Sequence, residues 1–135
     1  MIAAICIDDN NGMMFNKRRL SQDREIINDL IRNFGKHRIF TNNFSSILFE
    51  DYNDKVIIDD NLMSVAKKND VCFIENIEIN KYSDKINGII LYRWNRKYPS
   101  DMKLNMNLSN FKLDTQYDFK GNSHDKITRE VYIKC

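Results

Sequence analysis

Short apolar runs recur along the first two-thirds of the chain and alternate with segments of helical spacing. Residues 2–7 form an almost wholly apolar run, and similar runs follow at 38–41, 55–59, 70–75 and 88–94. A short continuous apolar run is typical of a strand that is covered on both faces in a parallel sheet. The alternation of such strands with helices predicts a mainly parallel sheet with right-handed crossovers.

The clearest helical pattern begins near residue 21. Ser21 can cap a helix whose first turn would hold Asp23 and Glu25, where negative charge suits the helix dipole. Gly35 is a natural stop for this helix. The apolar positions with helical spacing are Ile26, Ile27, Leu30 and Ile31.

Shorter helical segments are predicted near 43–49 and at 61–69, with a brief helical turn before residue 88. The stretch from Asn10 to Asp23 is predicted to be a loop between the first strand and the first helix.

The last third of the chain has a different pattern. Residues 111–119 and 127–135 alternate apolar and polar positions at period two, and a polar connection joins them. We therefore expect an antiparallel hairpin that closes the sheet. The full pattern predicts one three-layer α/β domain over residues 1–135, with a central, mostly parallel sheet of about eight strands between helices.

Composition narrows the function only slightly. The 21 basic and 19 acidic residues are interleaved, which argues against a dedicated polyanion binder. Cys6 and Cys72 lie in apolar runs, and with Cys135 they are expected to be reduced thiols of a cytoplasmic protein. No apolar run approaches the roughly 20 residues that cross a bilayer, so we expect no membrane partner. The apolar run at 1–7 is too short for a signal peptide.

The N-terminal segment resembles the opening of dihydrofolate reductases. In that family a first strand of small apolar residues leads to an Asp, a Gly-Met, a mobile loop over the active site, and a Leu-Pro-x-Asp/Glu at the first helix. The matching positions in this chain are Ile2-Ala3-Ala4, Asp8, Gly12-Met13 and Leu20-Ser21-Gln22-Asp23.

The C-terminal segment is similar to the closing hairpin of the same family. Residues 107–134 carry the Asn-Ser-His that precedes the last strand, at 122–124. Asp101 and Leu104 resemble the acidic-then-apolar segment that leads into the hairpin. The resemblance covers nearly the whole chain in order and implies the dihydrofolate reductase fold.

The residues at the family's cofactor site differ at three places. Glu75-Asn76 replaces a Gly-Gly pair that lets the backbone approach the cofactor pyrophosphate. Asn42-Asn43 replaces a Gly-Arg/Lys turn that holds the phosphate of NADPH, and Asp59-Asp60 replaces a Ser-rich turn. A carboxylate about 4 Å from a phosphate is repulsive by roughly 1–4 kcal/mol. These differences predict that no NADPH is bound.

The folate side of the family's site is also changed. The residue nearest to the family's substrate-pairing Arg is Asp54, and Tyr92 stands where a Thr supports the catalytic carboxylate. Asp23 is the one candidate for a proton-relay carboxylate, although an ungapped alignment places Ile26 there instead. Asp23 could equally be a first-turn residue that satisfies the helix dipole.

Our leading hypothesis is a divergent member of the family that has lost standard NADPH and folate binding. It would keep a cleft for another small molecule or for a partner protein. Asp23 is the catalytic candidate, and we expect neither a cofactor-binding residue nor a metal ligand. The candidates for lining the cleft are Ile5, Met13, Arg18, Arg19, Asn42, Asn43, Glu75, Asn76 and Tyr92.

Two alternatives stay open. An active reductase would use NADPH, with Asp23 relaying a proton and Arg18 or Arg19 supplying the lost basic contacts. A binding module would use the basic loop 17–19 and the aromatic and basic segment 92–98 to engage nucleic acid or protein. A short basic run is most often a solvated surface, so nucleic acid is the less favoured partner. The sequence does not predict an oligomeric state.

Overall fold

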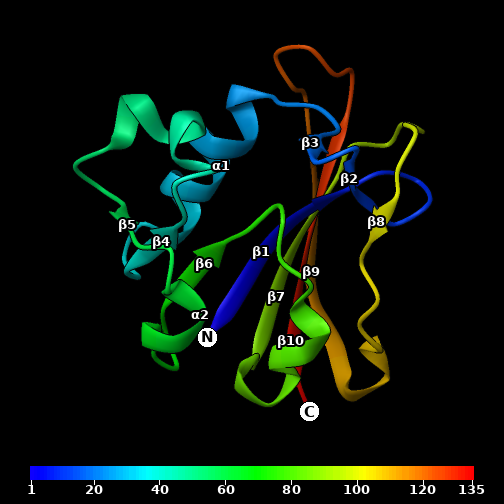
Figure 1. Ribbon diagram of the computed structural model, residues 1–135. Coiled ribbons are helices and arrows are strands. Elements are labelled where there is room, and N and C mark those ends of the chain that lie inside the picture. Colours follow the sequence, from blue (N-terminus) through cyan, green and yellow to red (C-terminus); the bar gives the residue numbers. More distant parts are fainter.

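Strand β1 (Ile2–Ile7) lies in the middle of the sheet because its residues are apolar on both faces. It pairs in parallel with β6 (Val71–Phe73) on one side and β7 (Gly88–Arg93) on the other. Figure 1 shows this arrangement in the computed structural model, which describes residues 1–135. β1 therefore supplies side chains to both layers of the core.

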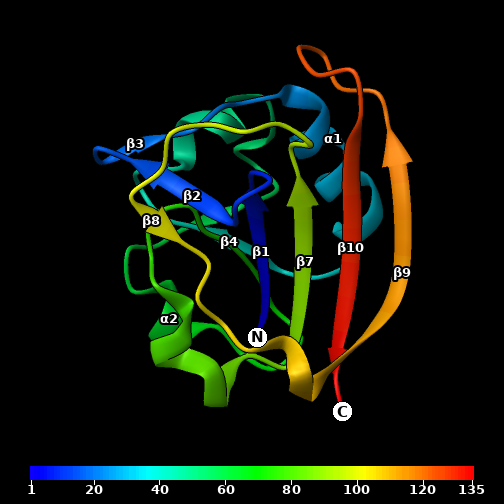
Figure 2. The same ribbon diagram turned by 90° about the vertical axis from the view of Figure 1, so that its right-hand side faces the viewer.

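The main sheet has seven strands in the order β5-β4-β6-β1-β7-β10-β9. The first five are parallel to one another, and the C-terminal hairpin β9–β10 adds two antiparallel strands, which stand at one edge in Figure 2. The mostly parallel sheet and the closing hairpin are confirmed, but the sheet has seven strands rather than about eight. The other four strands are β4 (Ile39–Thr41), β5 (Ile57–Ile58), β9 (Phe111–Phe119) and β10 (Ile127–Lys134).

The predicted loop after β1 contains a second, small sheet, so its prediction as a loop was wrong in part. Strands β2 (Gly12–Phe15) and β3 (Arg18–Arg19) form a hairpin, and β8 (Met102–Lys103) pairs with β2. Asn16 and Lys17 close the hairpin with φ of 51° and 62°. Two consecutive left-handed residues suit the tight turn of a hairpin, a position where glycine is the usual sequence signal.

Helix α1 (Arg24–Phe34) begins after Asp23 rather than after Ser21, which corrects the predicted cap. The Asp23 backbone is extended, and its carboxylate accepts a hydrogen bond from the Glu25 N–H. A carboxylate at this position also opposes the positive end of the helix dipole. The predicted end is confirmed, because Gly35 is the C-cap.

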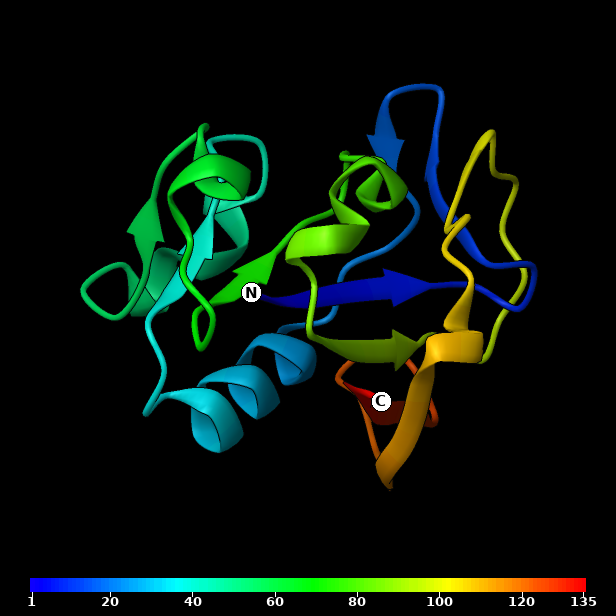
Figure 3. The same cartoon turned by 90° about the horizontal axis from the view of Figure 1, so that it is seen from below.

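Two helical layers cover the sheet, as the view in Figure 3 shows. Helix α1 and the 3₁₀ segment η1 (Ser46–Tyr52) pack on one face, while α2 (Leu62–Val65) and η2 (Ile79–Lys85) lie on the other. A further 3₁₀ turn, η3 (Leu108–Asn110), precedes β9. None of these helices combines the length and the hydrophobicity that a membrane crossing requires.

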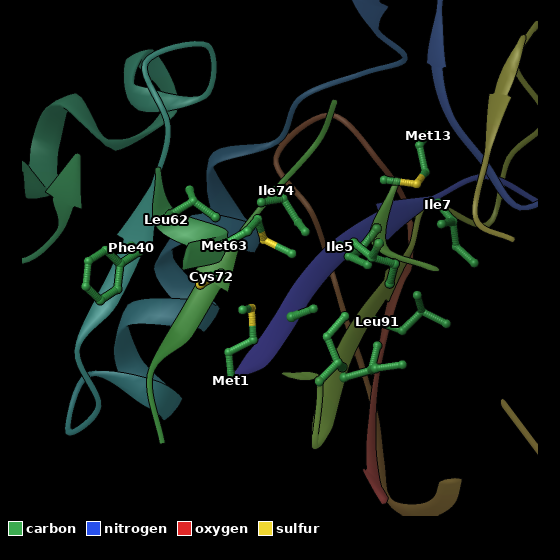
Figure 4. Packing of buried hydrophobic residues seen from close by; sticks show 14 of the residues in the cluster. Met1, Ile5, Ile7, Met13, Phe40, Leu62, Met63, Cys72, Ile74 and Leu91 are labelled. Carbon is green, nitrogen blue, oxygen red and sulfur yellow. The ribbon is translucent and has the colours of Figure 1, made fainter. Parts of the chain in front are cut away.

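Each face of the sheet has its own apolar cluster. Ile26, Ile27 and Leu30 of α1 pack against one face together with Phe49 and other residues. In Figure 4, Ile5 and Ile7 of β1 belong to the cluster on the opposite face, as do Met13 of the small sheet and Leu62 of α2. The small sheet is thus held to the main sheet by buried methionine.

Replacing Leu30 by Ala should destabilise the protein by about 2–5 kcal/mol. Leu30 is fully buried, so the substitution removes apolar contacts and leaves a cavity. Val65→Ala is the control, since Val65 is 44% exposed and its truncation should change stability by less than about 0.5 kcal/mol. Urea unfolding of both variants measures the difference, and equal losses would contradict the packing described for α1.

Candidate functional site

A cavity of about 510 Å³ lies at the carboxyl ends of β1 and β6, beside the start of α1. Crevices at this edge of an α/β sheet are where ligands commonly bind. Its apolar wall includes Ile26 and Ile27 of α1, Leu48 of η1 and Phe73 of β6. The opposite rim is polar and comes from the segments before α1 and before β10. The cavity can therefore hold a small molecule that is apolar on one side and polar on the other.

Asp23 is the most heavily hydrogen-bonded residue of the polar rim. Its carboxylate accepts hydrogen bonds from the backbone N–H groups of Glu25, Asn122 and Ser123, at 2.8–3.0 Å, and lies 2.9 Å from Nδ1 of His124. Burial raises the pKa of Asp23, but these hydrogen bonds outweigh it and lower the pKa to about 2. Asp23 is therefore an anion at neutral pH.

Gly121 allows the 121–124 loop to approach this carboxylate. A Cβ at position 121 would collide with Asp23 Oδ2 and would crowd Ile127. The glycine is thus required for the close approach, although its own φ is not positive.

His124 links three parts of the chain around the cavity. Its Nδ1 faces Asp23, while its Nε2 lies 3.1 Å from Ser21 Oγ and 3.0 Å from Tyr98 Oη. Trp94 stacks on the ring at 4.6 Å between centroids. Because a carboxylate only accepts hydrogen bonds, Nδ1 carries a proton towards Asp23, and Nε2 of the neutral ring accepts from a hydroxyl.

Cys6 lines the cavity from the end of β1. Burial, aided by the negative charge of Glu75, holds the pKa of its thiol well above its ordinary value. The thiolate is the nucleophilic form, so Cys6 contributes a small apolar surface rather than a reactive group.

Glu75 closes the cavity on the side of the β2–β3 hairpin. Arg19 Nε lies 3.1–3.2 Å from both carboxylate oxygens of Glu75, Arg19 Nη2 lies 3.0 Å from Oε1, and Ser45 Oγ donates to Oε1 at 2.7 Å. The Arg19 guanidinium also donates to the Phe44 carbonyl and packs 4.7 Å from the Phe44 ring centroid. This Arg19–Glu75–Ser45 bridge ties the hairpin to the ends of β4 and β6.

The two asparagines after β4 have internal partners too. Asn42 Nδ2 donates to Asn76 Oδ1 at 2.9 Å. The backbone N–H and side-chain amide of Asn43 both donate to the Asp60 carboxylate, at 2.9 and 2.8 Å, and these bonds lower the pKa of Asp60. The amide groups of this turn are thus occupied by groups of the chain itself.

The structure brings together only some of the residues that the sequence predicts to line the cleft. Asp23 and Glu75 line the cavity, and Arg19 contacts Glu75 at its edge. Ile5 and Met13 lie in the apolar core on the other face of the sheet. The other candidates, whose positions lie away from the lining, are Arg18, Asn42, Asn43, Asn76 and Tyr92.

Tyr92 is buried under α1, where its hydroxyl donates to Asp29 Oδ2 at 2.6 Å. Arg129 Nη1 donates to the other oxygen of Asp29, also at 2.6 Å. Tyr92 therefore does support a carboxylate, but that carboxylate is Asp29, which forms a buried brace between α1 and the sheet rather than part of the cavity.

Reasoning from the sequence missed four residues of the site, of which Ser21 and Trp94 line the cavity while His124 and Tyr98 lie outside its lining. Ser21 was interpreted as a helix cap, and His124 was identified only as part of the Asn-Ser-His before the last strand. Trp94 and Tyr98 were assigned to an aromatic segment. The Asn-Ser-His at 122–124 was the available signal, because it marks a loop that closes over the start of α1.

Fewer side chains than expected are exposed on the surface that a binding module would use, which is the basic loop 17–19 and the segment 92–98. Arg19 is engaged with Glu75, which leaves Lys17 and Arg18 as exposed cations of the basic loop. In the segment 92–98, Tyr92 and Trp94 are buried, so the aromatic side chains pack inward instead of forming a surface platform. No three His, Cys, Asp or Glu side chains gather in a way that could hold a metal ion.

Comparisons with known proteins support the fold. No protein-family model and no curated protein matches this sequence. Among solved structures, a dihydrofolate reductase from Enterococcus faecalis, determined in complex with NADP(H) and RAB-propyl, matches with a TM-score of 0.67. The match covers 99% of this chain and 96% of that chain at 10% identity. The likeness confirms a dihydrofolate reductase-like fold and extends no further than the fold.

Replacing Asp23 by Asn should lower stability at neutral pH and flatten its acid dependence. A pKa of about 2 in the folded state, below the ordinary 3.8, stabilises the fold by roughly 2 kcal/mol above pH 4. That contribution is lost as the pH falls from about 4 to 2. Urea unfolding across this range compares the wild type with Asp23→Asn.

The control is Asp114→Asn, because Asp114 is exposed on β9. This variant should keep the wild-type acid dependence. If Asp23→Asn also kept it, the hydrogen bonds described for Asp23 would not hold its charge.

Proposed function

We propose that this protein binds a small, largely apolar molecule in the cavity beside α1 and does not use NADPH as a reductase cofactor. The observation that carries the proposal is the Arg19–Glu75–Ser45 bridge. It puts a buried carboxylate where the family resemblance implies the glycine pair beside the cofactor pyrophosphate. A phosphate entering there would meet that charge and would compete with it for Arg19.

The turn after β4 supports the same proposal. Asp60 accepts one hydrogen bond from the backbone N–H of Asn43 and one from its side-chain amide. In the family this turn holds the phosphate of NADPH. Here the donors are satisfied by an internal anion, and the basic side chain of the family's turn is replaced by asparagine. The residues present do not fit the phosphates of this cofactor.

The charge state of Asp23 argues against a reductase mechanism. A group that delivers a proton works best when its pKa lies near the working pH. The pKa of Asp23 is about 2, and its oxygens are engaged by three backbone N–H groups and His124. Asp23 is thus suited to orienting a neighbour rather than to donating a proton.

The cavity itself stays open beside the bridge. Its volume of about 510 Å³ falls within the range of small-molecule sites, and half of the residues that line it are apolar. Arg24 is the one cation in the lining and already donates to Asn122 Oδ1. The site therefore favours a neutral molecule over a polyanion.

Isothermal titration with NADPH should show no micromolar affinity for the wild type. Glu75→Gln should bind NADPH at least about tenfold more tightly, because the substitution removes a repulsion of roughly 1.4 kcal/mol or more and frees Arg19. Glu78→Gln is the matched control, since Glu78 is exposed and outside the cavity.

Micromolar binding by the wild type, with NADPH oxidation in the presence of dihydrofolate or a related pterin, would overturn the proposal. That result would support the reductase alternative instead. The similar solved structure, a dihydrofolate reductase in complex with NADP(H), is the precedent for it.

Trp94 is the single tryptophan of the chain and lines the cavity, so its fluorescence reports occupancy. The neutral probe N-phenyl-1-naphthylamine should accept energy from Trp94 in a saturable titration. Ile47→Tyr should weaken this binding, because Ile47 lies at the cavity and is 59% exposed, so added bulk there narrows the entrance without disturbing the core. Ile57→Tyr, at an exposed residue of β5 away from the cavity, should bind like the wild type.

A further inference from the structure

The hydrogen bonds at the polar rim of the cavity are arranged in a way that ligand binding alone does not require. Ser21, His124 and Asp23 form a chain of hydrogen bonds, with Ser21 Oγ 3.1 Å from His124 Nε2 and His124 Nδ1 2.9 Å from Asp23 Oδ2. A hydroxyl, an imidazole and a buried carboxylate in this order constitute the arrangement that activates a serine nucleophile.

We propose that Ser21 is a nucleophile for acyl transfer and that the cavity takes small carboxylic esters with an apolar acyl group. This inference rests on the proposed function, because the ester would occupy the same cavity. Ser21 and Asp23 line that cavity, and Trp94, which stacks on His124, lines it too.

Ser21, His124 and Asp23 are each held in position by neighbouring groups. Asp23 is held by three backbone N–H groups, so it orients the Nδ1–H of His124 and keeps Nε2 as the acceptor. Trp94 covers one face of the imidazole, which limits its rotation. Asp23 is thus a positioning residue, while Ser21 and His124 are the catalytic residues.

The step balances without any other reactant than water. Ser21 Oγ bonds to the ester carbonyl carbon while its proton passes to His124 Nε2. The bond from that carbon to the alcohol oxygen then breaks, and the alcohol leaves with the proton. Water next attacks the acyl-serine, gives a proton to Nε2, and releases the carboxylic acid as Ser21 regains its proton.

The rest of the cavity matches this chemistry. Ile26, Ile27 and Phe73 offer an apolar wall for the acyl group. Arg24, whose guanidinium donates to Asn122 Oδ1, is the one cation of the lining, and its charge can offset part of the negative charge that develops on the carbonyl oxygen.

Tyr98 is the second hydroxyl within reach of Nε2, at 3.0 Å. It is not part of the cavity lining. When Ser21 carries an acyl group and has no proton to share, Tyr98 remains as a partner that keeps the ring in place.

The test uses a fluorophosphonate probe and p-nitrophenyl butyrate on the full chain. Peptide mass spectrometry should find the probe on Ser21, and Ser21→Ala should abolish both labelling and hydrolysis. His124→Gln should slow labelling by about 100-fold or more. Ser64→Ala, at an exposed serine away from the cavity, should match the wild type. Labelling elsewhere, or hydrolysis that persists in Ser21→Ala, would overturn the assignment.

Two further variants separate chemistry from folding. Asp23→Asn should slow labelling of Ser21 at neutral pH under conditions in which its circular dichroism spectrum matches that of the wild type, a split that a general loss of structure would not give. Ser21→Cys should react with iodoacetamide faster than Ser21→Cys combined with His124→Gln, because His124 activates the residue at position 21. Equal rates would overturn the proposal.

The two proposals fail in different ways. If the wild type binds N-phenyl-1-naphthylamine but Ser21 is not labelled, the acyl-transfer inference is wrong and the ligand-binding function stands. If N-phenyl-1-naphthylamine does not bind to the wild type, the proposed ligand-binding function itself is wrong.

Discussion

Every carboxylate that this fold buries must be given hydrogen-bond donors, and that requirement organises the carboxyl edge of the sheet. Asp8 accepts from the backbone of Gly12 and of Tyr98, which lies 90 residues away in the chain. Asp23 binds the 121–124 loop, and Glu75 binds Arg19 of the hairpin. A buried charge without partners costs several kcal/mol, so each of these carboxylates favours the loop position in which its donors reach it. The loops around the cavity are thereby held in one arrangement.

The main sheet could be predicted because its signals are local. The period-two pattern gave the bounds of β9 as they are found, and the apolar run at 2–7 gave β1. The small sheet could not be predicted, because Asn16 and Lys17 adopt the left-handed conformation without glycine. The choice between Ser21 and Asp23 as the helix cap also depended on donors from the 121–124 loop, which the local sequence does not show.

The site was harder to predict than the fold because its contacts are long-range. Asp23 and Glu75 stood out as charges in segments that resemble a cleft. Ser21 and His124 did not, since they meet only when the chain has folded, across 103 residues. No sequence pattern indicated the role of Gly121 either, although a side chain there would push Asp23 away from the loop. The family resemblance brought the right segments together, whereas the chemistry of the rim depended on individual side chains.

The acidic residues that we propose exclude phosphate also hold the segments around the cavity in place. Asp60 and Glu75 act as internal anions that are always present at the donors of Asn43 and Arg19, so a free phosphate must displace groups that the fold holds in place. The Arg19–Glu75 contact in turn holds the β2–β3 hairpin beside the cavity. The apolar wall of α1 and η1 needs no such partner, because it is part of the core. On the proposed function, Glu75 in place of a glycine and Asp60 in place of a Ser-rich turn change which molecules the fold accepts, while the cavity beside α1 keeps its volume.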